Sequence, residues 1–125
     1  MFFTFPIQPT PASRPRVSKW GSYYTGPYVA FRENVKPLLA EALAGWTPMD
    51  VPMIVTIGIY PERPKSSKLD YPKPDVDNYI KAILDVCNEK VWTDDHLIVN
   101  ISASKRWSDG AGYFTLQVEE FTDDE

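Results

Sequence analysis

Two residue types that often build functional sites are almost missing from this chain: it has one cysteine, Cys87, and one histidine, His96. A single cysteine excludes an internal disulfide and a cysteine-rich zinc site, and a single histidine is too few for a zinc site. Cys87 falls on the apolar side of an expected helix, where we expect it in the core. The sequence also contains neither a glycine-rich phosphate-binding loop nor a G-x-S-x-G motif.

Long apolar segments are missing as well. The longest apolar runs are far shorter than the roughly 20 residues that a membrane-spanning helix needs. Met1–Phe5 is apolar, but it has no basic flank and meets Pro6 too early for a signal peptide. We therefore expect a cytoplasmic protein with no membrane partner.

The composition that remains is that of an ordinary folded domain. The 125 residues are 43% hydrophobic and 24% charged, which predicts one domain over residues 1–120 and an acidic tail over residues 121–125.

Net charge alone argues against a nucleic-acid partner, because the formal charge is −4. The charge is unevenly distributed, however. Residues 1–70 carry eight Lys/Arg and five Asp/Glu, whereas residues 71–125 carry five Lys/Arg and twelve Asp/Glu. No acid precedes Glu33, and five acids fall within the last seven residues. Residues 1–70 therefore carry a net positive charge that can bind phosphate groups.

Hydrophobic periodicity predicts six regular elements. Alternating or continuous β-branched residues indicate strands, and apolar residues three and four apart indicate helices. The expected strands are 2–8, 51–60, 97–107 and 113–120, and the expected helices are 28–44 and 75–90. Turn residues at 108–112 predict that the last two strands form a hairpin.

The element order β–α–β–α–β–β predicts an α/β (α+β) fold, a single domain with one mixed sheet and helices packed on it. Pro6 indicates that the first strand lies at a sheet edge, because proline cannot donate a ladder hydrogen bond. Residues 9–27 and 61–73 are rich in proline and basic residues. We expect both to be long loops, which in compact domains are often functional.

Asp75 and Asp77 stand at the expected start of the second helix. Within a helix, side chains two residues apart point in different directions, but in the extended segment before a helix both carboxylates can face one side. Such a pair can seat a hard cation such as Mg²⁺. Aspartate is also favoured at helix N-termini for structural reasons, so the pair alone does not decide between the two interpretations.

A second acidic pair, Asp94 and Asp95, precedes the strand expected from about Leu97. Alternation along the row Leu97–Val99–Ile101 predicts that Asp95 lies on the buried side and that Asp94 faces solvent. A carboxylate in a buried row needs a partner, and a metal shared with the first acidic pair would supply one.

Lys81 follows Asp77 by four residues, so the two side chains are expected on one face of the helix. The structural interpretation is a simple ion pair between them. The functional interpretation is a cation placed near a phosphate in a transition state.

These residues belong to a longer pattern that resembles a known family. Residues 73–85 read Lys-Pro-Asp-Val-Asp-Asn-Tyr-Ile-Lys-Ala-Ile-Leu-Asp, and residues 91–95 read Val-Trp-Thr-Asp-Asp. Together they resemble the signature of RusA-type Holliday junction resolvases, small endonucleases of phages and prophages. The segment 11–16 resembles the family's basic N-terminal loop more loosely. Relatives often have Asn-Gly where this chain has Asn88-Glu89-Lys90, and a polar residue at Leu97.

The resemblance implies a Mg²⁺-dependent endodeoxyribonuclease, with Mn²⁺ as the alternative metal. It implies a homodimer that resolves four-way DNA junctions by paired nicks in the cytoplasm of a bacterial host. The implied metal ligands are Asp75, Asp77 and Asp95, and Lys81 is the implied catalytic lysine. Asp94 and Asn78 are expected accessory residues of this site.

Basic residues of the two long loops are expected to neutralise DNA phosphates. They are Arg14, Arg16, Lys19, Arg63, Lys65, Lys68 and Lys73. Aromatic residues interleave with the first loop, namely Trp20, Tyr23 and Tyr24. In one interpretation they stack on bases exposed at a junction centre, and in the other they pack onto the core.

Two further functions stay open at this point. One is a broader endonuclease of branched or forked DNA. The other is a non-catalytic nucleic-acid-binding module, in which the acids only cap a helix and a strand.

Overall fold

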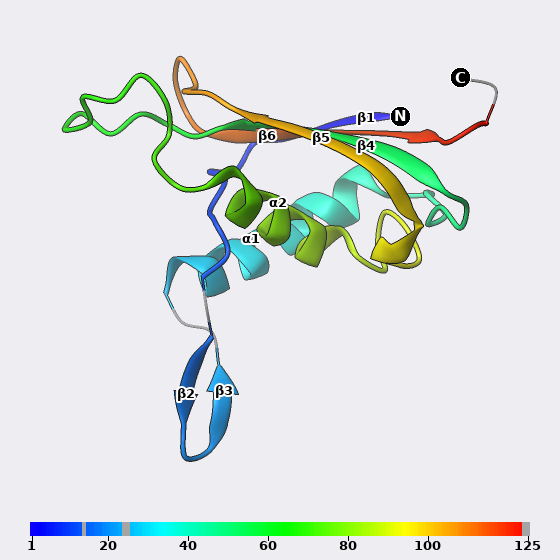
Figure 1. The fold of residues 1–125 in the computed structure, drawn as a ribbon, viewed down its shortest axis with the longest axis horizontal. Helices are drawn as coiled ribbons and strands as arrows, with labels where there is room; N and C mark the ends of the chain where they lie inside the picture. The colour runs from blue at the N-terminus through cyan, green and yellow to red at the C-terminus, as the bar shows by residue number, and fades with distance from the viewer. Residues whose placement is uncertain (14, 24–25, 124–125) are drawn as a thin grey trace.

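The computed structural model describes residues 1–13, 15–23 and 26–123, and the side chains of Arg16 and Tyr23 lie outside the described part. Within these residues, two α-helices lie against a four-stranded sheet, and a separate two-stranded hairpin projects from the body (Figure 1). In chain order the elements are β1 (Phe2–Phe5), β2 (Arg16–Ser18), β3 (Gly21–Tyr23), α1 (Pro27–Ala42), β4 (Met53–Tyr60), α2 (Val76–Cys87), the short 3₁₀ helix η1 (Asp95–Leu97), β5 (Ile98–Lys105) and β6 (Tyr113–Glu120).

The sheet has the strand order β1–β6–β4–β5 and is mixed, as the sequence predicts. β6 runs antiparallel to both β1 and β4, whereas β5 runs parallel to β4. A parallel neighbour requires a crossover connection, and α2 provides it. β1 lies at the sheet edge, which confirms the expectation from Pro6.

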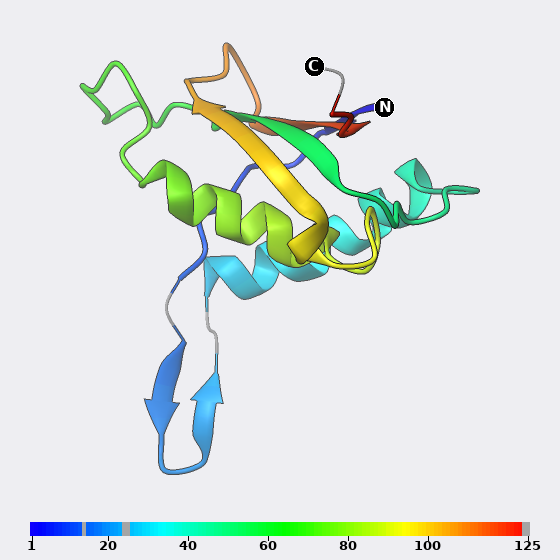
Figure 2. The ribbon, with the colours of Figure 1, turned by 45° about the vertical axis from the view of Figure 1, so that its right-hand side comes forward.

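Both helices cover the same face of the sheet, and the other face is open to solvent (Figures 1 and 2). The helices bury residues three and four apart, which include Phe31, Val35 and Leu39 of α1 and Tyr79, Ile83 and Cys87 of α2. These side chains meet the inward row of β4, which consists of Met53, Val55, Ile57 and Ile59. The helical and strand periodicities of the sequence therefore build a single core between the two layers.

The expected hairpin between the last two strands is wrong. β5 and β6 are not paired with each other, because β4 lies between them: Val55 pairs with Ile101 on one side and with Val118 on the other. The apolar strand β4 takes the central position, where it is paired on both sides and covered by helices. The turn residues at 108–112 therefore belong to a connection that crosses the end of β4.

Three further expectations need correction. The row Leu97–Val99–Ile101 is not buried, since β5 is an edge strand on which Val99 is 52% and Ile101 38% exposed. Asp95 begins η1 and does not extend a strand. The segment 9–27 is also not wholly a loop, because β2 and β3 pair within it.

The helices are shorter than the expected 28–44 and 75–90, ending at Ala42 and Cys87. None of the described helices is long and apolar enough to cross a membrane.

Candidate active site

The first acidic pair, Asp75 and Asp77, lies at the start of α2. Asp75 is the N-cap residue, with extended backbone angles, and its carbonyl oxygen accepts hydrogen bonds from Asn78 N–H at 3.1 Å and Tyr79 N–H at 3.4 Å. Its carboxylate makes no capping hydrogen bond in the described structure. Both Asp75 and Asp77 are exposed. The helix therefore begins without using the Asp75 side chain, which argues against the interpretation that this acid only caps a helix.

Lys81 lies one turn further along the same face of α2. Its Nζ atom is 3.6 Å from Oδ2 of Asp85, so the ion pair that forms joins Lys81 to the following turn, four residues on. The spacing in the sequence instead predicts an ion pair with Asp77, four residues before Lys81. Asp77, Lys81 and Asp85 are four residues apart in succession, which places acid, base and acid in one row along the helix.

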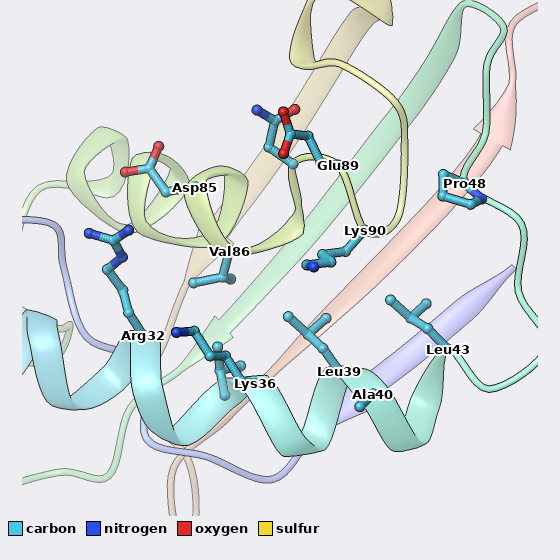
Figure 3. Close-up of a pocket in the computed structure, with 12 residues that line it drawn as sticks. Arg32, Lys36, Leu39, Ala40, Leu43, Pro48, Asp85, Val86, Glu89 and Lys90 are labelled. Atoms are coloured by element: carbon cyan, nitrogen blue, oxygen red, sulfur yellow. The ribbon is translucent and has the colours of Figure 1, made fainter.

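Asp85 is a site residue that sequence reasoning missed. Its Oδ2 atom accepts a hydrogen bond of 2.5 Å from the hydroxyl of Tyr28, a buried residue of α1 that is 57 positions away. Arg32, one helical turn beyond Tyr28, points toward Asp85 across the gap between the helices (Figure 3). The spacing from Lys81 signals Asp85 in the sequence, but nothing in the sequence signals Tyr28.

Asp95 reaches the same region from η1. Its Oδ1 atom accepts a hydrogen bond of 2.6 Å from the indole N–H of Trp92, and its backbone N–H donates to Oδ1 of Asn88 at 3.1 Å. Trp92 is fully buried. A core side chain therefore holds the carboxylate of Asp95, and Asn88 at the end of α2 holds its backbone.

The electrostatics of Asp95 show which charges surround it. Burial raises the pKa of its carboxyl group, the Trp92 hydrogen bond opposes this rise, and the carboxylates of Asp85 and Asp94 raise the pKa further. Lys81 acts in the opposite direction. Asp95, Asp85 and Lys81 thus form one electrostatic cluster, in which excess negative charge favours a proton or a cation.

Asp94 has a different role. Its carboxylate accepts a hydrogen bond from His96 N–H at 3.1 Å, so it caps η1. It is exposed, as expected. Asn78, the other expected accessory residue, contributes its backbone oxygen, which accepts a 2.9 Å hydrogen bond from Ala12 N–H. This bond joins the amino-terminal segment to the first turn of α2.

Comparison with known proteins decides the family. The family model described as endodeoxyribonuclease RusA matches residues 6–118, nearly the whole chain. The chain belongs to the RusA endodeoxyribonuclease family. An uncharacterized protein of Bacillus subtilis (strain 168), YqaN, is 43% identical over 37 residues. That match covers 30% of this chain and only 26% of YqaN.

In this RusA-family chain, hydrogen bonds hold the second basic loop (residues 61–73) beside the start of α2. The indole N–H of Trp107 donates to Leu69 O at 3.0 Å, and Lys105 Nζ donates to Pro74 O at 2.8 Å. The expected phosphate-binding residues of this loop are all exposed, and they are Arg63, Lys65, Lys68 and Lys73. Lys105 is a further cation at this end of the site that sequence reasoning missed.

The first basic loop is described in part. Lys19 is exposed near the tip of the β2–β3 hairpin. Arg14, Tyr24 and the side chains of Arg16 and Tyr23 lie outside the described residues.

A pocket of about 500 Å³ opens between α1 and α2, with Asp85 at its rim (Figure 3). Asp77, Lys81 and Asp95 do not line it. The cluster therefore touches this pocket only through Asp85. Asp77 and Lys81 are exposed on the surface of α2, where a long polymer can reach them.

The donor set suits a hard metal ion. In the part of the chain that the structure describes, no three Asp, Glu, His or Cys side chains converge closely enough to hold a metal ion by themselves. Mg²⁺ is usually held by one or two carboxylates together with waters and substrate phosphate oxygens. The exposed carboxylates of Asp75 and Asp77 are oxygen donors of this kind, and waters and DNA would contribute the remaining oxygen ligands. The charges that shift the pKa of Asp95 come from Asp85, Asp94 and Lys81.

Proposed function

We propose that this chain is a Mg²⁺-dependent endodeoxyribonuclease that resolves four-way DNA junctions by paired nicks. It would act as a homodimer on branched DNA in the cytoplasm of a bacterial host, encoded by a phage or prophage. The observation that carries the proposal is the cluster of Lys81, Asp85 and Asp95. At the start of the same helix, the exposed Asp75 carboxylate is not used in capping. Family membership supports the DNA-hydrolysing chemistry.

Asp75, Asp77 and Asp95 would hold the metal. When bound, Mg²⁺ would polarise the scissile phosphate and lower the pKa of an attacking water. The chain's own contribution is to fix the groups around that phosphate. Trp92 and Asn88 hold Asp95 in one orientation, so its carboxylate is in place before DNA arrives.

Lys81 would interact with the phosphoryl oxygens, on which negative charge grows during hydrolysis. The ion pair with Asp85 restrains its flexible side chain, and Tyr28 restrains Asp85 in turn. Exposed basic residues of the 61–73 loop, with Lys19 on the hairpin, would neutralise phosphates further along the strands.

Two scissile phosphates related by a two-fold axis suit a two-fold symmetric enzyme. We therefore propose that each protomer contributes one site. A plasmid carrying an extruded cruciform tests the pairing, since two nicks within the lifetime of one complex linearise it and independent nicks leave an open circle. Sedimentation analysis of the free protein tests the dimer.

The direct test is cleavage of a labelled four-way junction with Mg²⁺, compared with a fork and a linear duplex of the same sequence. We expect the junction to be cut and Asp77→Asn to abolish cutting, while junction binding in Ca²⁺ changes little. Lys81→Ala should lower the nicking rate about 100- to 1000-fold, the usual cost of removing a group that stabilises transition-state charge. Asp123→Asn, in the acidic tail beyond residue 120, is the matched control and should cut normally.

Tight junction binding without nicking in Mg²⁺ or Mn²⁺ would contradict the proposal and favour a binding module. Equal cutting of junction and fork would instead favour the broader branched-DNA endonuclease.

A further inference from the structure

The β2–β3 hairpin forms an arm that projects beyond the helices, away from the sheet (Figures 1 and 2). We define the hairpin arm as residues 16–23. Ser18 pairs with Gly21, so Lys19 and Trp20 form its tip. Ser18 Oγ accepts a hydrogen bond from Trp20 N–H at 3.1 Å, and Gly21 has a φ angle of +117°, which glycine tolerates at this turn. The tip is thus a defined two-residue turn.

The arm exposes apolar surface that a folded protein normally buries. Trp20 is 86% and Val17 is 80% exposed. Trp20 therefore does not pack onto the core, which was one of the two interpretations of the aromatic residues in this segment. An isolated two-stranded hairpin is marginally stable in water, and an exposed indole at its tip gains by stacking on a partner.

The charge around the tip selects the kind of partner. Lys19 Nζ lies 4.9 Å from the centre of the Trp20 ring, and no acidic residue precedes Glu33 in the chain. An aromatic plane beside a cation, on an arm without acids, matches a ligand that has both flat rings and negative charge. Nucleic acid has both, because its bases stack on aromatic side chains and its phosphates pair with lysine.

On each side of the arm, the chain is hydrogen-bonded to α2, the helix that carries part of the candidate active site. Before the arm, Ala12 N–H donates to Asn78 O at 2.9 Å, and after it the Tyr28 hydroxyl donates to Asp85 at 2.5 Å. Asn78 and Asp85 are about 10 Å apart along α2, and Lys81 lies between them. Ala12 and Tyr28, which flank the arm in the chain, therefore both lie against α2 near Lys81.

We infer that Trp20 stacks on a base that is unpaired or unstacked at the branch point of the DNA, and that this contact makes the protein prefer branched over linear DNA. The inference rests on the proposed function, because it takes the substrate to be branched DNA. A linear duplex keeps its bases stacked on one another and offers the indole no free face. The arm thereby binds the branch point, while the cluster of Lys81, Asp85 and Asp95 acts on the nearby phosphate.

The test measures binding in Ca²⁺, at one fixed salt concentration, to a four-way junction with 2-aminopurine at the branch point and to a linear duplex of the same sequence. Trp20→Ala should weaken junction binding about 5- to 150-fold, the fold-change that corresponds to about 1–3 kcal/mol of base stacking. Duplex binding should change less than about threefold. The wild-type protein should change the 2-aminopurine fluorescence at the branch, and Trp20→Ala should not.

Three comparisons keep this test specific. Trp20→Phe keeps a stacking ring and should retain most of the junction preference. Val17→Ala removes exposed apolar surface away from the tip and should leave the preference unchanged. Lys19→Gln removes a phosphate contact and should weaken junction and duplex binding alike.

The inference is overturned if Trp20→Ala binds the junction as the wild type does, or loses junction and duplex binding equally. A change of oligomeric state in Trp20→Ala would also overturn it, because Trp20 would then be covered by a second copy. Failure of the proposed function looks different: the junction would be bound in a Trp20-dependent way and not cut in Mg²⁺.

Discussion

The hydrogen bond from Tyr28 to Asp85 joins the two helices behind the candidate site, and Tyr28→Phe removes it with almost no change of shape. A hydrogen bond to a charged group contributes about 1.5–3 kcal/mol to stability. The Asp85 side chain is 32% exposed, so water can partly replace the lost hydroxyl. We therefore expect a loss near the lower end of the range, about 1.5 kcal/mol. The Arg32 guanidinium, 5.6 Å from the ring centre of Tyr28, can still face a phenylalanine ring.

Urea unfolding of the metal-free protein measures this loss. With a slope of about 2 kcal/mol per molar urea, the midpoint should fall by about 0.7 M. For a chain of this size the melting temperature should fall by about 5 °C. Tyr71→Phe is the control: its hydroxyl is on an exposed residue, and we expect a change within about 0.5 kcal/mol.

A double-mutant cycle with Asp85→Asn shows whether the loss belongs to this contact. In the Asp85→Asn background, Tyr28→Phe should cost clearly less than in the wild type. The reasoning is refuted if Tyr28→Phe unfolds at the wild-type urea concentration, or if its cost is the same in both backgrounds.

Two further variants test other features of the site. The folded-state pKa of Asp95 is raised, so its contribution to stability is fully present below the ordinary carboxyl pKa and is lost as the pH rises through the raised one. The Asp95→Asn side chain cannot ionise and still offers an oxygen to Trp92. This variant should therefore raise the urea midpoint of the metal-free protein at pH 7, but not below about pH 3.5. An equal gain at both pH values would argue against this electrostatic cause. Glu89 has a φ angle of +67°, which is costly for a residue with a Cβ atom. Glu89→Gly should raise the stability by about 0.5–1 kcal/mol in thermal unfolding, and an equal gain from Glu89→Ala would show that backbone strain is not the reason.

At Glu89, the comparison with the family pattern can be set beside the backbone conformation. Glu89 stands where relatives of the RusA family often have the glycine of an Asn-Gly pair, and the structure gives it the left-handed backbone that glycine favours. The sequence shows the departure, but only the structure shows the positive φ angle at this position. Across the same loop, Asp95 N–H donates a hydrogen bond to Asn88 Oδ1.

The error about the last two strands has an equally specific cause. Residues 108–112 have the composition of a hairpin turn, and both flanking segments are strands, so the local pattern was correct. The local pattern does not say which strand each of the two segments pairs with. β4, whose inward row is fully buried, takes the central place between β5 and β6.

The sequence by itself determined the helices, the strands, the mixed α/β class and the two acidic motifs. These depend on residues that are close together in the chain, where helical and strand periodicity and family patterns can be recognised directly. The tertiary structure alone decided three other features: the position of β4 between β5 and β6, the contact of Tyr28 with Asp85, and the exposure of Trp20 on a projecting arm. Each of these depends on which distant segments meet, or fail to meet, when two helices pack on one face of a sheet, and no local pattern of residues encodes that choice.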